Sequence, residues 1–176
     1  MTIDLAALDT AAEVINDSLS DHHCFGCGDL NPSGLQLRFR LLPNDDGVWA
    51  RFSPDRGHEG YLGMVHGGIL STMLDEAMSW AITTSGALGV TARMEVAFRQ
   101  PASVGDELIV VGQVQDRRRR LIDVRGSIYR VSDHGLIADA EARFMKVSSE
   151  QAAAWRSAYR ADASSAFGRA ADQGSC

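Results

Sequence analysis

The stretch that decides the fold is Val65-His66-Gly67-Gly68-Ile69 followed by Leu70-Ser71-Thr72-Met73-Leu74-Asp75-Glu76-Ala77-Met78. Its glycine pair opens a segment that is apolar on most sides at helical spacing, which is typical of a helix that the rest of the protein wraps around. We predict a central helix from about Gly67 to Thr84, closed by Ser85-Gly86. A carboxylate is out of place on such a helix unless it serves a site, so we expect Asp75 to lie partly buried beside one.

Length and composition indicate one domain. The chain has 176 residues, 45% of them apolar, which is enough for a substantial core. Its net charge of −6 and pI near 5.3 would repel nucleic acid and acidic membranes. No apolar run approaches the roughly 20 residues that span a bilayer, and no basic leader is seen, so we expect a cytoplasmic protein. The odd set of cysteines, Cys24, Cys27 and Cys176, predicts reduced thiols.

The first part of the chain is predicted to contain a helix, a loop and a hairpin. Apolar residues at steps of three and four predict an amphipathic helix over residues 1–20: Leu5, Leu8, Ala12, Ile15 and Leu19. Residues 21–34 are rich in Gly, Asn, Pro and Cys, which indicates a structured loop that walls a site. Alternating apolar residues over 35–41 and 48–52, around a turn at 43–47, predict a β-hairpin.

The part after Gly89 is predicted to be mainly β-structure. Strands are expected near residues 94–98, 107–114, 122–131 and 136–147, with a turn at the run Arg117 to Arg120. Because short turns join most of them, we predict an α+β domain over residues 21–148, with a mainly antiparallel sheet wrapped around the long central helix. Residues 149–176 are expected to form a C-terminal helix and a flexible tail.

The start of the central helix and Asp75 together suggest acyl-transfer chemistry. The first N–H groups of a helix lack intrahelical acceptors, so Gly67, aided by Gly68, can donate to a developing oxyanion. Asp75 can serve as general base or nucleophile, but it lies eight residues beyond Gly67, about 12 Å along the axis. Two copies with antiparallel helices would bring Gly67 of one to Asp75 of the other, so the spacing predicts a catalytic dimer.

An ordered series of motifs extends from about Cys24 to Val147. The series is Cys24-Phe25-Gly26-Cys27-Gly28, Asn31-Pro32-Ser33-Gly34-Leu35, Gly60-Tyr61-Leu62-Gly63-Met64-Val65-His66-Gly67-Gly68, Leu74-Asp75-Glu76-Ala77, Thr91-Ala92-Arg93-Met94-Glu95-Val96, Phe98-Arg99-Gln100-Pro101 and Gly105-Asp106. In this series the chain resembles the hotdog-fold acyl-CoA thioesterases of the PaaI-like branch. The resemblance implies a hotdog fold and a homo-oligomer, either a dimer or a dimer of dimers.

The same resemblance implies roles for single residues. In that family the amide at the position of Gly67 polarises the thioester carbonyl, and the acid at the position of Asp75 activates water or attacks directly. The family places a hydroxyl residue at Thr91, near the acid or its water. The expected substrate is an acyl-CoA, hydrolysed to a carboxylic acid and free coenzyme A, and no metal or redox cofactor is expected.

The loop before the helix departs from the family. Many relatives carry Asn or Gln there to hold the substrate carbonyl or water, whereas this chain has His58-Glu59-Gly60. In one interpretation His58 or Glu59 supplies a polar contact, and in the other the role is absent. Together with Gly68 and Asn31, this loop makes up the predicted substrate-binding set.

Each predicted catalytic residue also has a structural interpretation. Asp75 can be a buried acid satisfied by a helix end or a threonine, and Glu76, about 100° around the helix, competes with it as the base. His66 can cap the helix and orient the loop, or lie close to the thioester as a proton carrier. Thr91 can be an ordinary strand residue with high β propensity.

Two further patterns have alternative interpretations. The segment His22-His23-Cys24-Phe25-Gly26-Cys27 has the paired cysteines of many zinc sites, but no second pair follows, and His58 or His66 would have to complete the site. We predict instead a loop over the acyl pocket and no metal. The run Arg117 to Arg120 either contacts the phosphates of coenzyme A or forms a solvated turn.

Two other functions fit the sequence less well than thioester hydrolysis. A hotdog dehydratase or hydratase binds the same thioesters but pairs a histidine with an acid, and the loop here does not resemble that motif. A non-catalytic module that binds acyl-CoA would keep the pocket without turnover, which Asp75 together with Gly67 argues against. The sequence leaves the acyl group open.

Overall fold

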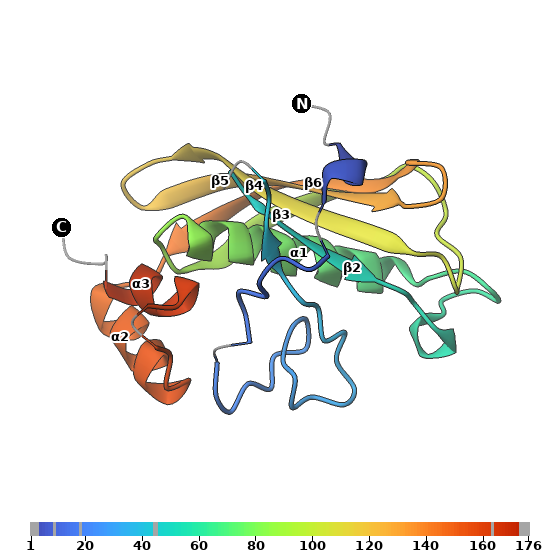
Figure 1. Ribbon diagram of the computed structural model, residues 1–176. Coiled ribbons are helices and arrows are strands. Elements are labelled where there is room, and N and C mark those ends of the chain that lie inside the picture. The colour runs from blue at the N-terminus through green and yellow to red at the C-terminus, as the bar shows by residue number, and fades with distance from the viewer. Residues whose placement is uncertain (1–3, 9, 18, 44–45, 163, 173–176) are drawn as a thin grey trace.

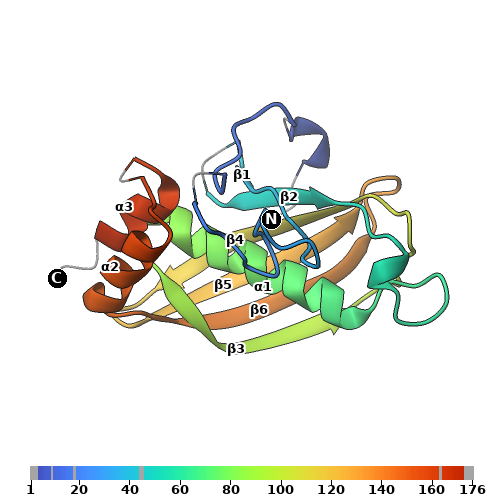
Figure 2. The ribbon, with the colours of Figure 1, turned by 90° about the horizontal axis from the view of Figure 1, so that it is seen from below.

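The central helix α1 spans Gly67–Thr84 in the computed structural model, as the apolar pattern predicts. It runs along one face of a six-stranded sheet, and the N-terminal segment crosses its other side (Figures 1 and 2). The structure describes residues 4–8, 10–17, 19–43, 46–162 and 164–172. Within them α1 is covered from both sides, which explains why it is apolar nearly all round.

The sheet has the antiparallel character that the short turns predict. Its strand order is β1-β2-β4-β5-β6-β3, and the neighbouring strands pair antiparallel. The strands are β1 (Arg40–Leu41), β2 (Val48–Phe52), β3 (Gly89–Phe98), β4 (Leu108–Arg117), β5 (Leu121–Arg130) and β6 (Leu136–Lys146). A short 3₁₀ helix, η2 (Arg56–His58), precedes α1. The predicted α+β fold is confirmed.

The helix and the sheet meet in a tightly packed core. Met73, Leu74 and Met78 of α1 are fully buried. At Gly112 of β4, an added Cβ would lie 2.2 Å from the carbonyl oxygen of Ala77, a contact that only glycine allows. This close approach fixes α1 against the middle of the sheet.

Strand β3 is the long exposed edge of the sheet. Nine of its ten residues pair with β6, and β3 is the last strand in the order of the described sheet. Thr91, Arg93 and Glu95 are exposed on it. An edge of this length presents a row of free N–H and C=O groups, which is a template for pairing with another chain.

The predicted helix over residues 1–20 is wrong. Its described residues form one 3₁₀ turn, Leu5–Ala7, followed by turns and irregular backbone. The side chain of Asn16 shows the reason, because it donates to Leu37 O at 2.8 Å and accepts from Phe39 N at 2.9 Å. Asparagine is a weak helix former, and here hydrogen bonds to a distant segment replace those of a helix.

The predicted hairpin forms with a shorter first strand. Only Arg40–Leu41 pairs with β2, although the apolar residues of 35–39 are buried as their alternation predicts. The backbone before β1 pairs with the preceding loop instead, and Leu37 N donates to Gly26 O at 3.0 Å. The loop of residues 21–34 is therefore a fixed part of the domain.

Two helices follow the sheet and lie together at one end of α1 (Figure 1). They are α2 (Ser149–Ala158), which the sequence predicts, and α3 (Ala166–Asp172), which corrects the expectation of a flexible tail. Ala166 and Ala170 of α3 are buried, so this small-residue segment gains apolar contacts that its composition did not reveal. Within the described ranges, the helices are too short or too polar to cross a membrane.

Candidate active site

His66 caps the start of α1. Its Nδ1 accepts a hydrogen bond of 2.8 Å from the N–H of Gly68, and its own N–H donates to His58 O, also at 2.8 Å. Gly60 packs against the imidazole, where an added Cβ would lie 3.1 Å from the ring. His66 therefore acts as the helix cap, as one of the two interpretations predicts. The Gly68 N–H, which we expected to assist an oxyanion, is already hydrogen-bonded to His66.

Gly67 is the first residue of α1. Among the described residues, no acceptor is hydrogen-bonded to its N–H. The ring of Phe98 lies over it, 3.3 Å from where a Cβ would stand, and is 54% exposed. The start of α1 therefore offers one open amide at the positive end of a helix, beside an apolar wall.

Asp75 and Thr91 are brought together at the edge of the sheet. Thr91 Oγ1, on β3, donates a hydrogen bond of 2.6 Å to Asp75 Oδ1. Asp75 is partly buried and Thr91 is exposed. A hydroxyl that donates to a carboxylate fixes its orientation and leaves lone pairs on the other oxygen for water or substrate.

The other predicted binding residues make local hydrogen bonds. The imidazole of His58 caps η2, the Glu59 carboxylate accepts from Gly63 N–H at 3.1 Å, and Asn31 Oδ1 accepts from Ser33 N–H at 3.0 Å. These bonds shape the two loops beside α1. Direct substrate contacts from these side chains stay a prediction.

The arginine run lies at the turn between β4 and β5. Arg117 Nη1 donates to Ser85 O at 2.6 Å, and Arg118 Nε donates to Asp116 at 3.0 Å. Two of the four side chains are therefore bonded within the protein, as the solvated-turn interpretation expects.

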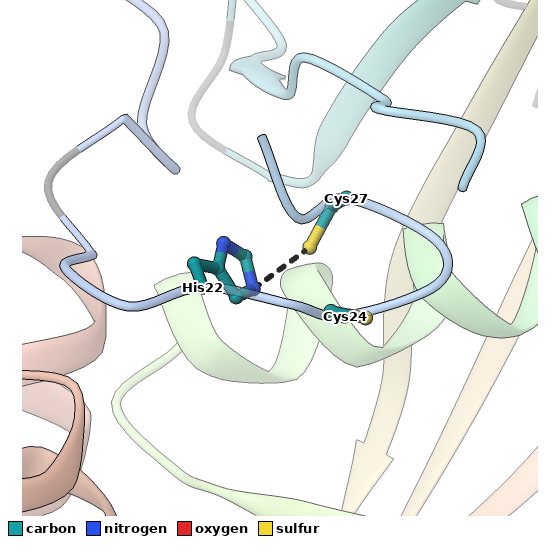
Figure 3. A group of neighbouring side chains, drawn as sticks. All are labelled: His22, Cys24 and Cys27. Atoms are coloured by element: carbon teal, nitrogen blue, oxygen red, sulfur yellow. Dashed lines mark hydrogen bonds between the residues drawn. The ribbon is translucent and has the colours of Figure 1, made fainter. Parts of the chain in front are cut away.

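A second cluster of reactive side chains lies around Glu76. Glu76 Oε2 lies 3.4 Å from Cys24 Sγ, and Cys27 Sγ lies 3.5 Å from His22 Nε2 (Figure 3). His22 and Cys27 are 4% and 1% exposed. From α1, Trp80 donates its indole N–H to Cys27 Sγ at 3.3 Å.

The close packing of this cluster shifts three pKa values. The hydrogen bond from the Cys27 thiol, with His22 adding to it, lowers the pKa of Cys24 to about 3. The same bond, together with burial, raises the pKa of Cys27 far above its usual range. Burial and the charge of Cys24 raise the pKa of Glu76 to about 8. The ionisation of these three groups is therefore coupled across the contact between the loop and α1.

Comparison with known proteins identifies the fold. Residues 62–137 match the sequence profile of the thioesterase superfamily. This matched segment contains α1, β3, β4 and β5. Acyl-coenzyme A thioesterase 13 of Mus musculus is 30% identical over 66 residues, which cover 36% of this chain and 47% of that protein. The chain thus spans about half the length of the curated relatives that it matches.

Solved structures of thioesterase-superfamily proteins share the architecture. One crystal structure of such a protein superposes with a TM-score of 0.67 at 22% sequence identity, covering 77% of this chain and 70% of the other. The E. coli PaaI protein, from the phenylacetic acid degradation operon, superposes with a TM-score of 0.58 at 16% identity, covering 64% and 80%. The likeness confirms the predicted hotdog fold.

The predicted catalytic residues form two groups. Thr91 contacts Asp75, whereas His66 contacts Gly68. Gly67, at the start of the same helix, stays eight residues from Asp75 in one chain. No single protomer therefore presents the predicted base and the predicted oxyanion donor side by side.

The cluster around Glu76 is the feature that the sequence prediction missed. The zinc interpretation already contained His22 together with the cysteine pair, but it relied on His58 or His66 to complete the site, and we predicted no metal. The group that joins His22, Cys24 and Cys27 is instead the carboxylate of Glu76 on α1. The spacing His-x-Cys-x-x-Cys and the second acid beside Asp75 were the available signals.

Proposed function

We propose that this protein is an acyl-CoA thioesterase, which hydrolyses the thioester to a carboxylic acid and free coenzyme A. The observation that carries the proposal is the 2.6 Å hydrogen bond from Thr91 to Asp75, on a helix that begins with the open amide of Gly67. A held carboxylate and an oxyanion donor are the groups that acyl transfer requires. The acyl-coenzyme A thioesterase relative supports the substrate class.

In the proposed reaction, Asp75 takes a proton from a water molecule as that water attacks the thioester carbonyl carbon. The carbonyl oxygen gains negative charge and accepts a hydrogen bond from the Gly67 N–H at the positive end of α1. The tetrahedral intermediate then collapses, the carbon–sulfur bond breaks, and the coenzyme A thiolate takes up a proton. Thr91 keeps the Asp75 carboxylate aimed at the water. In the alternative route, Asp75 attacks the carbonyl directly and water hydrolyses the resulting anhydride.

We also propose that the site is completed across a dimer. Gly67 and Asp75 are separated by about 12 Å of helix within one chain, so a second copy has to supply one of them. The long exposed edge of β3 can pair with the same strand of that copy, and it carries Thr91, the partner of Asp75. A two-fold axis there gives two equivalent sites. A dimer of dimers is the alternative assembly.

The other predicted residues act through shape in this proposal. His66 holds the first turn of α1 through Gly68, and the Glu59 carboxylate closes the turn before it. The exposed ring of Phe98 supplies an apolar wall for the acyl group beside the oxyanion donor. The free thiols of the N-terminal loop fit a reducing compartment, so a cytoplasmic location is part of the proposal.

Thiol release from a panel of short, medium, long and aromatic acyl-CoA substrates tests the proposal. Wild-type protein is assayed beside Asp75→Ala and Asp75→Asn. Turnover of at least one substrate that both variants lose supports hydrolysis through Asp75, and full turnover in Asp75→Ala overturns that role. If folded wild-type protein releases no thiol, the function is instead acyl-CoA binding without turnover or dehydratase chemistry, neither of which frees coenzyme A.

A further inference from the structure

The cluster around Glu76 has the donor set of a metal site. The nearest ligand atoms of His22, Cys24 and Cys27 lie within 4.8 Å of one another (Figure 3). Glu76 Oε2 contacts Cys24 Sγ at 3.4 Å and also interacts with Cys27. The cluster offers two sulfurs, one imidazole nitrogen and one carboxylate oxygen. Such a set binds zinc in preference to magnesium or calcium, which take oxygen ligands.

The distances match the edges of a zinc coordination tetrahedron. With Zn–S bonds of about 2.3 Å and Zn–N or Zn–O bonds of about 2.0–2.1 Å, neighbouring sulfur and nitrogen or oxygen ligands lie about 3.5–3.6 Å apart. Cys27 Sγ and His22 Nε2 are separated by 3.5 Å, and Cys24 Sγ and Glu76 Oε2 by 3.4 Å. Each of these two pairs therefore already has the spacing of neighbouring zinc ligands.

The backbone of the loop is folded tightly to bring these side chains together. Gly28 N donates to Cys24 O at 2.9 Å, and an added Cβ on Gly28 would lie 2.5 Å from His22 O. At Gly26 an added Cβ would lie 2.4 Å from Glu76 Oε2, so any other residue here would displace the Glu76 side chain. Both glycines therefore allow the cysteine loop to fold tightly and to lie close to Glu76.

One of the two sulfur atoms also accepts a hydrogen bond from α1. Trp80 Nε1 donates to Cys27 Sγ at 3.3 Å, where the loop packs against the helix. N–H donors around a sulfur stabilise the negative charge that a metal-bound cysteine carries. A pair of cysteines that served only as apolar filling would not need them.

We propose that His22, Cys24, Cys27 and Glu76 form a structural zinc site that fastens the N-terminal loop to α1. All four positions of the tetrahedron are then occupied by protein atoms, as in structural rather than catalytic zinc sites. Zinc binds the deprotonated side chains, so the thiol and carboxyl protons pass to solvent on binding. The site would hold in place the described residues 10–17 and 19–39, which form no helix or strand.

Metal analysis of the full-length protein tests the proposal, and its readout does not depend on thioesterase activity. Protein reduced with a phosphine is loaded with zinc, freed of excess metal by gel filtration and measured by mass spectrometry of the elements. The expected result is one zinc per chain. Cobalt(II) in place of zinc should give the intense visible bands of a tetrahedral ion and sulfur-to-cobalt charge transfer.

Single substitutions identify the ligands. Cys24→Ser, Cys27→Ser and His22→Ala should each weaken zinc binding more than about 100-fold in competition with a chelator, beyond the effect of losing a residue that only supports a ligand. His23→Ala is the matched control, because His23 is exposed beside His22 and should keep full affinity. Glu76→Gln should weaken binding as the other ligand variants do.

The wild-type protein alone can overturn the proposal, so it does not depend on whether the variants fold. Reduced wild-type protein that takes up neither zinc nor cobalt excludes the site. Uptake of cobalt with the weak bands of an octahedral ion excludes this ligand set. A Cys24–Cys27 disulfide in the purified protein, with no metal uptake after reduction, would make the pair a redox couple instead. Unchanged zinc affinity in folded Glu76→Gln would show that Glu76 is not a ligand, which would overturn the proposed four-ligand structural site.

Discussion

Two neighbouring carboxylates on α1 lie in opposite surroundings. Asp75 accepts a short hydrogen bond from Thr91 at the exposed edge of the sheet, where water has access. Glu76, about 100° around the helix, faces the sulfur of Cys24, and burial raises its pKa to about 8. The two side chains differ by one methylene group. The partners and the burial of each carboxylate, rather than its own chemistry, decide whether it can take part in a reaction or can help to hold the loop against the helix.

The layering of the fold produces this difference. One turn of α1 touches β3 through Asp75 and the N-terminal loop through Glu76, because the sheet and the loop cover different sides of the helix (Figure 2). A helix covered on several sides can carry one site on each side without either interfering with the other. The comparison therefore predicts that hydrolysis and metal binding can be lost separately.

The largest effect is expected at Asp75. Asp75→Asn removes the proposed general base and should lower kcat by about 10²–10⁴-fold while leaving the zinc content unchanged. Thiol release measures kcat, and elemental analysis measures the zinc content. Glu141→Gln, at an exposed carboxylate of β6, is the control and should keep wild-type turnover. An Asp75→Asn protein that lost its zinc together with its turnover would break the separation between the two sides of α1.

A second large effect is expected from removing the Gly67 amide. Gly67→Pro deletes the N–H at the first helical position, where proline is well tolerated, and His66 already has φ −64° and ψ 134°, which suit a residue before proline. Losing one oxyanion donor should lower kcat by about 10²–10³-fold. Gly67→Ala keeps the amide and also adds a Cβ against Phe98, so it reports the cost of that contact alone.

Mixing the two inactive proteins tests the shared site. If Gly67 and Asp75 of different protomers form each site, a heterodimer of Gly67→Pro and Asp75→Asn contains one intact site and one doubly altered site. Random exchange of equal amounts should then restore roughly a quarter of wild-type activity. If both groups served the same site from one chain, every site would carry a defect and mixing would restore nothing.

The strong local patterns predicted the fold well. The apolar pattern gave α1 its bounds at Gly67 and Thr84, and alternation with short turns gave β4, β5 and β6. The prediction failed at the chain ends, because tertiary hydrogen bonds to Asn16 and burial of α3 decide those segments. Neither these hydrogen bonds nor this burial produces a periodic pattern of residues in the sequence.

The sequence pointed to the individual residues of the two clusters, but it did not predict all of the contacts between them. The family resemblance put Thr91 near Asp75, and the two side chains are hydrogen-bonded. The partners of Cys24 could not be predicted by spacing alone, because Glu76 reaches it across 52 residues of sequence. A pairing of that kind depends on how the loop crosses α1, which only the assembled fold defines.

A smaller effect is expected at Thr91. Thr91→Val keeps the shape and removes the hydroxyl that orients Asp75, and a hydrogen bond to a carboxylate of this kind corresponds to about 10–100-fold in rate. We expect the loss in kcat rather than in KM, because the hydroxyl acts on the base and not on the bound substrate. Thr91→Ser should recover most of the activity. Equal losses in the Ser and Val variants would show that the methyl group, and hence packing, is what matters on this side of α1.

The smallest effect is expected at Trp80, on the side of Glu76. Trp80→Phe keeps a buried aromatic ring and removes the N–H that reaches Cys27 Sγ, so zinc affinity should fall by about tenfold, the lower range for a group that supports a metal ligand. Chelator competition measures the affinity, and Trp49→Phe, in a separate part of the core, controls for replacing a buried tryptophan. Equal zinc affinity in Trp80→Phe and wild-type protein would mean that the indole only packs against the loop. A drop confined to Trp80→Phe would show that metal binding beside Glu76 depends on a donor carried by α1 itself, just as we propose that catalysis by Asp75 depends on the Thr91 hydroxyl of β3.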